Sequence, residues 1–221
     1  MVAVERGNRI ELSALAWKAK VLPLYEPRVL NTYMIIITPV DKQCNLFLVE
    51  NVYSNELIAE IQTLDLMSYP YEKVSLQEHT PRRNLQFIEG DVLSRLNHET
   101  TANLHSISQV IGIPLAGTGT AVWLDHDQFS MGIHEDNSAV DIAMQVYLLP
   151  NDVGFGTKFY HGMIGSQGNR YAGHLRHDFP YVVNTGYIMI NAPGQFHGIP
   201  LTLPPGTVRC SAYSYLARST V

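Results

Sequence analysis

The sequence has few cysteines and no long apolar run. Its 221 residues include two cysteines, Cys44 and Cys210, which lie far apart and lack the spacing of a metal-binding motif. We therefore expect free thiols in a reducing compartment, and a cytoplasmic protein. No apolar run approaches the roughly 20 residues that cross a membrane. The first residues also lack the apolar core of a secretory signal, so we expect no membrane partner.

Charge is sparse and slightly acidic. Only 16% of the residues are charged, and the formal net charge is -5. Proteins that bind nucleic acid through its phosphates usually carry a clear basic surface, so the composition disfavours nucleic acid as the partner. With 46% hydrophobic residues, the chain has enough apolar material for a sizeable core. The length favours one domain, and the oligomeric state is left open.

The chain divides near residue 34 into two parts of different character. Residues 1–33 hold one short amphipathic segment and then two prolines that interrupt regular structure. We expect this part to be an N-terminal extension, either loosely attached or mis-annotated, since loose ends concentrate at termini. Residues 34–221 are expected to form a single domain whose core spans about 118–217.

Helices are expected in the first half of this domain and strands mainly in the second. Ser54 can act as the N-cap of a first helix, and Asp91 can cap a longer one that ends at Gly112. Strands are expected at 35–38, 45–52, 74–77, 121–124, 129–136, 142–149, 156–160, 181–191, 196–199 and 208–216. A turn at 125–127 would join two of them as a hairpin, and 161–179 reads as a long loop. This order predicts an α+β, mainly β fold: a sandwich or, more specifically, a jelly roll (double-stranded β-helix) with N-terminal supporting helices on one face.

The stretch from Met131 to Asn137 places an imidazole and a carboxylate two residues apart. In an extended strand such residues point to the same face, so His134 and Asp136 can converge on one metal ion while Glu135 points away. Downstream, His197 offers a second imidazole in a similar setting. Two histidines and one carboxylate with open positions form the facial triad of non-haem Fe(II) oxygenases. A His-x-Asp pair taken alone is more often a hydrogen-bonded surface pair.

The last strand carries a cation that fits the same pattern. Arg209, Ser211, Tyr213 and Tyr215 share one strand face by period two. A guanidinium on an interior face is costly to bury unless an anion arrives, and its planar fork suits a carboxylate. Arg209 is therefore a candidate carboxylate-binding residue, with a salt-bridged strand residue as the alternative.

These residues belong to an ordered set of motifs. The set comprises His134-Glu135-Asp136-Asn137, Gln145-Val146-Tyr147-Leu148, Gly156-Thr157-Lys158-Phe159-Tyr160, Asn184-Thr185-Gly186, His197-Gly198-Ile199-Pro200 and Gly206-Thr207-Val208-Arg209-Cys210-Ser211. Over about 121–217 it resembles the Fe(II)/2-oxoglutarate-dependent dioxygenases, closest to their prolyl 4-hydroxylase-like branch. The helices before it match that family only in kind.

The resemblance implies a set of ligands and cosubstrates. His134, Asp136 and His197 would be the catalytic metal ligands for Fe(II), with 2-oxoglutarate and O2 as cosubstrates and ascorbate as an optional addition. Arg209 would bind the far carboxylate of 2-oxoglutarate, with hydroxyls from Tyr147 and Ser211 beside it. For these two hydroxyl residues the alternatives are plain interior packing roles.

The implied reaction hydroxylates an unactivated C–H bond of an amino acid, a peptide side chain or a small molecule, and releases succinate and CO2. The presence of Asp136 favours hydroxylation, because halogenating relatives commonly carry a small residue there. One alternative is a non-catalytic cupin-like protein that binds a metal and a carboxylate, and another is a metal-dependent hydrolase. The loop at 161–179 is a candidate lid. Arg82 and Arg83 could grip an acidic substrate group or form a solvated charge pair.

Overall fold

The computed structural model describes residues 34–41, 45–74, 82–86, 88–126, 128–137, 140–151, 154–164 and 171–219. These residues belong to one compact unit, Thr32–Val221. The extension expected over residues 1–33, and Cys44, lie outside the described residues.

The expected helices are present, and local sequence explains where they begin and end. The helical segments are α1 (Asn55–Thr63), η1 (Leu66–Ser68), η2 (Glu89–Asp91) and α2 (Val92–Ile111). The Ser54 hydroxyl accepts a hydrogen bond from the Leu57 N–H, which confirms the predicted N-cap. Gly112 ends α2 in the left-handed region at φ 72°, where a glycine carries no Cβ penalty. Asp91 does precede α2, but its side chain makes no capping hydrogen bond.

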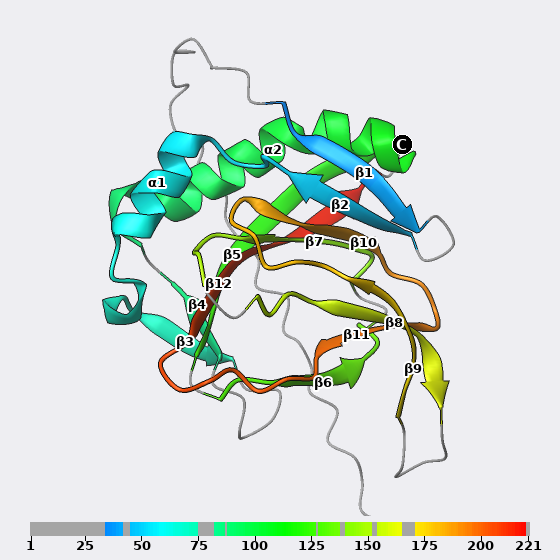
Figure 1. Ribbon diagram of the computed structural model, residues 1–221. Helices are drawn as coiled ribbons and strands as arrows, with labels where there is room; N and C mark the ends of the chain where they lie inside the picture. The colour runs from blue at the N-terminus through cyan, green and yellow to red at the C-terminus, as the bar shows by residue number, and fades with distance from the viewer. Residues whose placement is uncertain are drawn as a thin grey trace, which may run out of the picture. The chain divides into compact units, whose positions relative to one another are not determined.

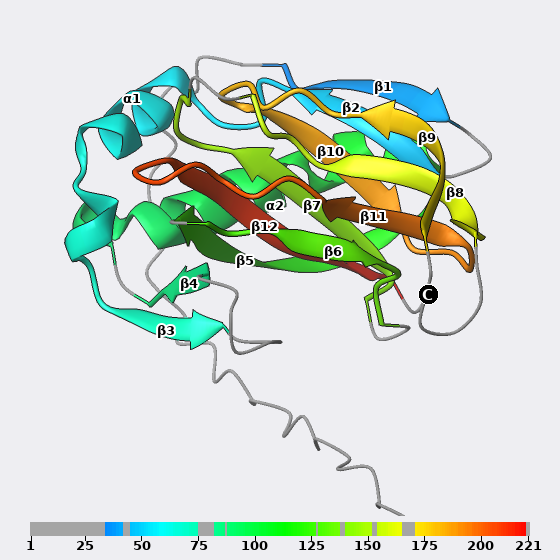
Figure 2. The same ribbon diagram turned by 60° about the horizontal axis from the view of Figure 1, so that its bottom comes forward.

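The strands of the described residues form two antiparallel sheets. The major sheet has the order β1-β2-β10-β7-β12-β5-β4-β3, and the minor sheet has the order β6-β11-β8-β9. The bounds are β1 Ile36–Asp41, β2 Leu46–Glu50, β3 Tyr71–Val74, β4 Arg82–Leu85, β5 Leu115–His126, β6 Met131–His134, β7 Ile142–Tyr147, β8 Lys158–Ile164, β9 Tyr171–Asp178, β10 Thr185–Ile190, β11 Gln195–Ile199 and β12 Val208–Arg218. Helix α2 runs along one face of the major sheet, and the minor sheet covers the other (Figures 1 and 2).

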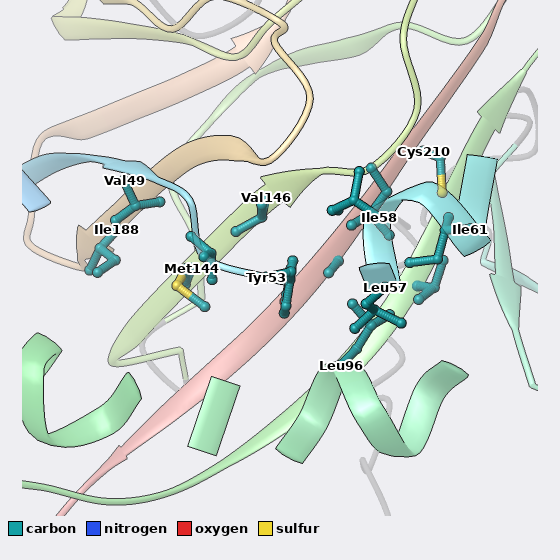
Figure 3. Packing of buried hydrophobic residues seen from close by; sticks show 14 of the residues in the cluster. Val49, Tyr53, Leu57, Ile58, Ile61, Leu96, Met144, Val146, Ile188 and Cys210 are labelled. Carbon is teal, nitrogen blue, oxygen red and sulfur yellow. The ribbon is translucent and has the colours of Figure 1, made fainter. Parts of the chain in front are cut away.

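Apolar side chains fill both spaces beside the major sheet. Figure 3 shows side chains of α1 and α2 packed against strand residues such as Val146 and Cys210. A second cluster lies between the two sheets and includes Phe159, Tyr187 and Tyr213. Because side chains alternate along a strand, each central strand of the major sheet supplies both clusters. The predicted jelly roll with helices on one face is confirmed.

Two local predictions were wrong. Strands β5 and β6 do not form a hairpin, because β5 lies in the major sheet and β6 in the minor sheet. Asp125 and His126, expected in the turn, are strand residues of β5 that pair with Arg209 and Val208 of β12. The pairing with β12 overrides the local preference of Asp and His for a turn. The expected loop at 161–179 instead contains most of β8 and β9, which pair as an antiparallel hairpin.

Candidate metal and carboxylate site

The three predicted metal ligands come together where β6 pairs with β11. His197 of β11 lies opposite His134 of β6 in the register of the minor sheet. The Nε2 atoms of both rings lie 3.5 Å from Oδ1 of Asp136. One ligand atom from each of the three residues falls within 4.8 Å of the others. A single cation could therefore contact all three side chains.

Gly198 allows the two strands to approach this closely. A Cβ atom at Gly198 would lie 2.8 Å from the carbonyl oxygen of Met131 and 3.1 Å from Cα of Ile133. Any larger residue would push β6 away from β11. The glycine beside His197 is thus required for the distance between the two imidazoles.

The protonation states of these groups suit a divalent cation. Burial lowers the pKa of His197 to about 4, so this ring is neutral at physiological pH. The hydrogen bond with Asp136 is the main cause of the raised pKa of His134. Burial by itself would raise the pKa of Asp136, but the contacts with His134 and His197 outweigh it and lower that pKa. An ionised carboxylate beside two imidazoles fits a first-row divalent metal.

Neighbouring groups fix the orientation of both rings. Nδ1 of His134 lies 2.8 Å from the carbonyl oxygen of Gly132, which leaves Nε2 directed toward Asp136. The His197 ring stacks on Phe159, with centroids 5.2 Å apart and planes 23° apart. The ligand set is therefore held in place by contacts that do not depend on a metal.

Arg209 is fully buried, as the strand period predicts, but it already has an acidic partner. Its Nη1 donates to Oδ2 of Asp125 at 2.8 Å, and its Nη2 lies 3.3 Å from Oγ1 of Thr157. Its Nε has no hydrogen-bond partner among the described residues. The salt-bridged alternative is thus observed, and one donor of the guanidinium is still unsatisfied.

Asp125 has a second basic partner, Arg82 of β4. Nε and Nη2 of Arg82 donate to the two carboxylate oxygens at 2.6 and 3.0 Å. The three side chains lie side by side because Arg82 pairs with Asp125 across β4 and β5, and Asp125 pairs with Arg209 across β5 and β12. Arg82 is buried, so its interpretation as part of a solvated charge pair was wrong. We call Arg82, Asp125 and Arg209 the Arg–Asp–Arg cluster.

Tyr147 and Ser211 lie on the same interior face as Arg209, and their hydroxyls bind neighbours that sequence reasoning did not assign to the site. The Tyr147 hydroxyl accepts from the Thr157 N–H at 3.0 Å. The Ser211 hydroxyl accepts from Nε2 of Gln145 at 2.8 Å. Thr157 and Gln145 both lie within the ordered set of motifs. Gln145 is two residues before Tyr147 on β7, and Thr157 belongs to the Gly156–Tyr160 segment.

The predicted metal ligands and the Arg–Asp–Arg cluster both border the apolar cluster between the two sheets, because His197 stacks on Phe159 and Arg82 lies against Trp123. Burial raises the pKa of Tyr213, the charge of Asp136 adds to the rise, and the charge of Arg82 opposes it, so both charges act on this ring. A chain of contacts also runs from His197 to Gln145, whose Nε2 donates to the Ser211 hydroxyl. Phe159 packs on His197 and on Tyr187, and the Tyr187 hydroxyl donates to Oε1 of Gln145 at 2.7 Å.

Comparison with solved structures identifies the class of fold. Neither protein-family models nor curated proteins give a match to this chain. A Pseudomonas putida prolyl-4-hydroxylase superposes with a TM-score of 0.54 at 14% identity, covering 79% of this chain and 93% of that one. HygX from Streptomyces hygroscopicus, solved with nickel and 2-oxoglutarate bound, gives 0.53 at 13% identity, covering 79% and 83%. The α-ketoglutarate-dependent epimerase SnoN from nogalamycin biosynthesis gives 0.58 at 15% identity, covering 80% and 77%.

These likenesses define the fold. The described residues adopt the double-stranded β-helix found in 2-oxoglutarate–Fe(II) oxygenases, including prolyl hydroxylases. The resemblance inferred from the ordered motifs is therefore confirmed at the level of the fold. Because one fold hosts many functions, the activity has to be argued from the site itself.

Proposed function

We propose that the protein is an Fe(II)- and 2-oxoglutarate-dependent oxygenase that hydroxylates an unactivated C–H bond. The observation that carries the proposal is the convergence of His134, Asp136 and His197 to within 4.8 Å, in the same interior as the fully buried Arg209. Two imidazoles and a carboxylate leave open coordination positions on a metal. A buried guanidinium provides a partner for an anion.

In this proposal the chain's own residues bind and orient the reactants. His134 and His197 bind Fe(II) through Nε2, and the carbonyl of Gly132 and the ring of Phe159 hold the two imidazoles. A bound Fe(II) would activate O2, which is the oxidant for the hydroxylation, while 2-oxoglutarate is oxidised to succinate and CO2.

Arg209 binds the far carboxylate of 2-oxoglutarate. Its guanidinium can offer two parallel N–H donors, the geometry that a carboxylate prefers. Thr157 and Tyr147 lie beside it, and the Tyr147 ring centre is 5.2 Å from Cζ of Arg209. Ser211 lies two residues after Arg209 on β12, so its hydroxyl is on the same face. This hydroxyl would bind the carboxylate in place of its present hydrogen bond with Gln145.

The substrate is proposed only as a class: an amino acid, a peptide side chain or a small molecule. Solved structures with this fold include a Trichoplax adhaerens prolyl hydroxylase in complex with a peptide fragment and HygX with hygromycin B bound. They also include an epimerase and a carbocyclase, so the fold leaves the outcome open. Asp136 favours hydroxylation because it occupies a metal position that halogenation would leave to chloride. A cytoplasmic location stays a prediction from the cysteine content. Among the described residues, no helix is both long enough and apolar enough to span a membrane.

The test is anaerobic addition of Fe(II) and 2-oxoglutarate. We expect the weak visible metal-to-ligand charge-transfer band in the wild type and its loss in His134→Ala. His98→Ala is a matched control, because His98 is an exposed residue of α2 on the opposite face of the major sheet. A missing band, or a band that persists in His134→Ala, would favour a non-catalytic cupin-like protein. Succinate formation that does not require O2 would contradict the oxygenase proposal.

A further inference from the structure

Asp125 divides its carboxylate unequally between two buried arginines. Arg82 binds both oxygens, through Nε at 2.6 Å and Nη2 at 3.0 Å, in the bidentate geometry that gives the strongest pairing. Arg209 donates a single hydrogen bond to Asp125, from Nη1 to Oδ2 at 2.8 Å, and its Nε has no partner among the described residues. Asp125 thus satisfies Arg82 more completely than Arg209.

The charges of the Arg–Asp–Arg cluster do not cancel. One carboxylate faces two guanidiniums, which leaves these three groups with an excess of one positive charge. The Asp125 and Arg209 side chains are 0% exposed and the Arg82 side chain is 8% exposed. An uncompensated charge is costly to bury. The location of the excess positive charge therefore determines where an anion would bind.

We propose that Arg82 is a positioning residue that keeps Arg209 available for the carboxylate of 2-oxoglutarate. Arg82 neutralises Asp125, so Asp125 can orient the Arg209 guanidinium without cancelling its charge. If Arg82 were absent, Asp125 would pair with Arg209 alone and compete with the incoming carboxylate. This inference rests on the proposed function and assigns a role to β4, a strand that lies before α2 in the chain.

The surroundings of Arg82 hold it in this role. Its Cζ lies 4.3 Å from the ring centre of Trp123 and 4.7 Å from that of Phe129, within the range of cation–π attraction. Trp123 is itself stacked on Tyr213, with centroids 4.0 Å apart. Two aromatic rings and a bidentate carboxylate leave the Arg82 guanidinium little freedom to turn toward another anion.

The experiment compares two keto acids that differ only in the far carboxylate. Binding of 2-oxoglutarate and of 2-oxobutyrate to the full-length Fe(II) protein is titrated anaerobically by the charge-transfer band. Both ligands have the same metal-chelating end, and 2-oxobutyrate lacks the group that Arg209 would bind. We expect Arg82→Gln to weaken 2-oxoglutarate binding by at least about tenfold and to leave 2-oxobutyrate binding unchanged.

Two further variants separate charge from packing. Arg82→Lys keeps the positive charge and should retain most of the affinity for 2-oxoglutarate. The double variant Arg82→Gln/Asp125→Asn removes both charges, leaves the positive charge of Arg209, and should bind 2-oxoglutarate more tightly than Arg82→Gln alone. If Arg82→Gln does not fold, the double variant decides: binding within about tenfold of the wild type supports the inference, and a larger loss overturns it.

The inference is wrong if Arg82→Gln binds 2-oxoglutarate as the wild type does. It is also wrong if this variant loses affinity for both keto acids equally, because that result indicates a purely structural ion pair. Failure of the proposed function looks different: the wild type itself would bind Fe(II) but show no band with either keto acid. In that case the role inferred for Arg82 would be wrong together with the proposed function.

Discussion

His197 lies directly opposite His134 in the antiparallel pairing of β11 with β6. This register brings both Nε2 atoms to 3.5 Å from the same carboxylate oxygen of Asp136. The proposed metal site thus depends on the spacing of two strands in the minor sheet as much as on the three candidate ligands themselves. Changes to that spacing should affect metal binding before they affect the rest of the fold.

Gly198→Ala is expected to weaken metal binding by about tenfold or more. The new Cβ would meet backbone atoms of Met131 and Ile133 at 2.8 and 3.1 Å, and the strands must separate to accept it. We expect a loss of stability of about 1–3 kcal/mol as well, as for other overpacked sites. Isothermal titration with Mn²⁺ measures the first effect and urea unfolding the second. Gly119→Ala is the matched control, since nothing lies within 4 Å of its added Cβ; equal metal affinity in both variants would refute the argument.

Asp136→Asn is expected to lower the pKa of His134 in the metal-free protein. The hydrogen bond and charge of the Asp136 carboxylate favour the protonated ring, so their removal favours the neutral ring. The titration of the His134 ring by NMR measures the shift. The same reasoning predicts that metal affinity in the wild type rises with pH below the raised pKa of His134, because binding must displace that proton. An unchanged or higher pKa in Asp136→Asn would contradict the assignment.

Asn184→Gly is expected to destabilise the protein less than Asn184→Ala. Asn184 has a left-handed backbone, at φ 58°, and its side chain binds both the N–H and the carbonyl of Tyr53. Both variants lose these buried hydrogen bonds, at about 1–3 kcal/mol. Alanine in addition carries a left-handed penalty of about 1 kcal/mol, which glycine avoids. Urea unfolding compares the two, and an equal loss would show that the backbone conformation relaxes.

Cys210 should be unreactive toward thiol reagents in the folded protein. Its side chain is 0% exposed in the cluster between the helices and the major sheet, and burial raises the pKa of the thiol. In a Cys44→Ser background, we expect labelling by Ellman's reagent only after addition of denaturant. Rapid labelling of the native protein would place this face of the sheet in contact with solvent and contradict the packing.

The sequence predicted those features that depend on neighbouring residues in the chain. Successive side chains of a strand point to opposite faces, and this alternation does not depend on which strand pairs with it. It therefore places His134 and Asp136 on one face of their strand, and Arg209 and Ser211 on one face of theirs. The Ser54 cap and the Gly112 stop are likewise local, since each depends on a few adjacent backbone groups. These features, in their order along the chain, predicted the jelly roll that the structure shows and indicated His134, Asp136 and His197 as candidate metal ligands.

Only the tertiary structure decided which strands pair and in which register. Asp125 and its neighbours have the composition of a turn, and only pairing with β12 and β4 makes Asp125 the partner of both Arg209 and Arg82. The burial of Arg82 follows from the same pairing, which no local pattern encodes. Side-chain alternation is determined by the covalent geometry of the chain, whereas register is determined by packing between segments distant in sequence. The strand register therefore decided how the charges of this interior are shared.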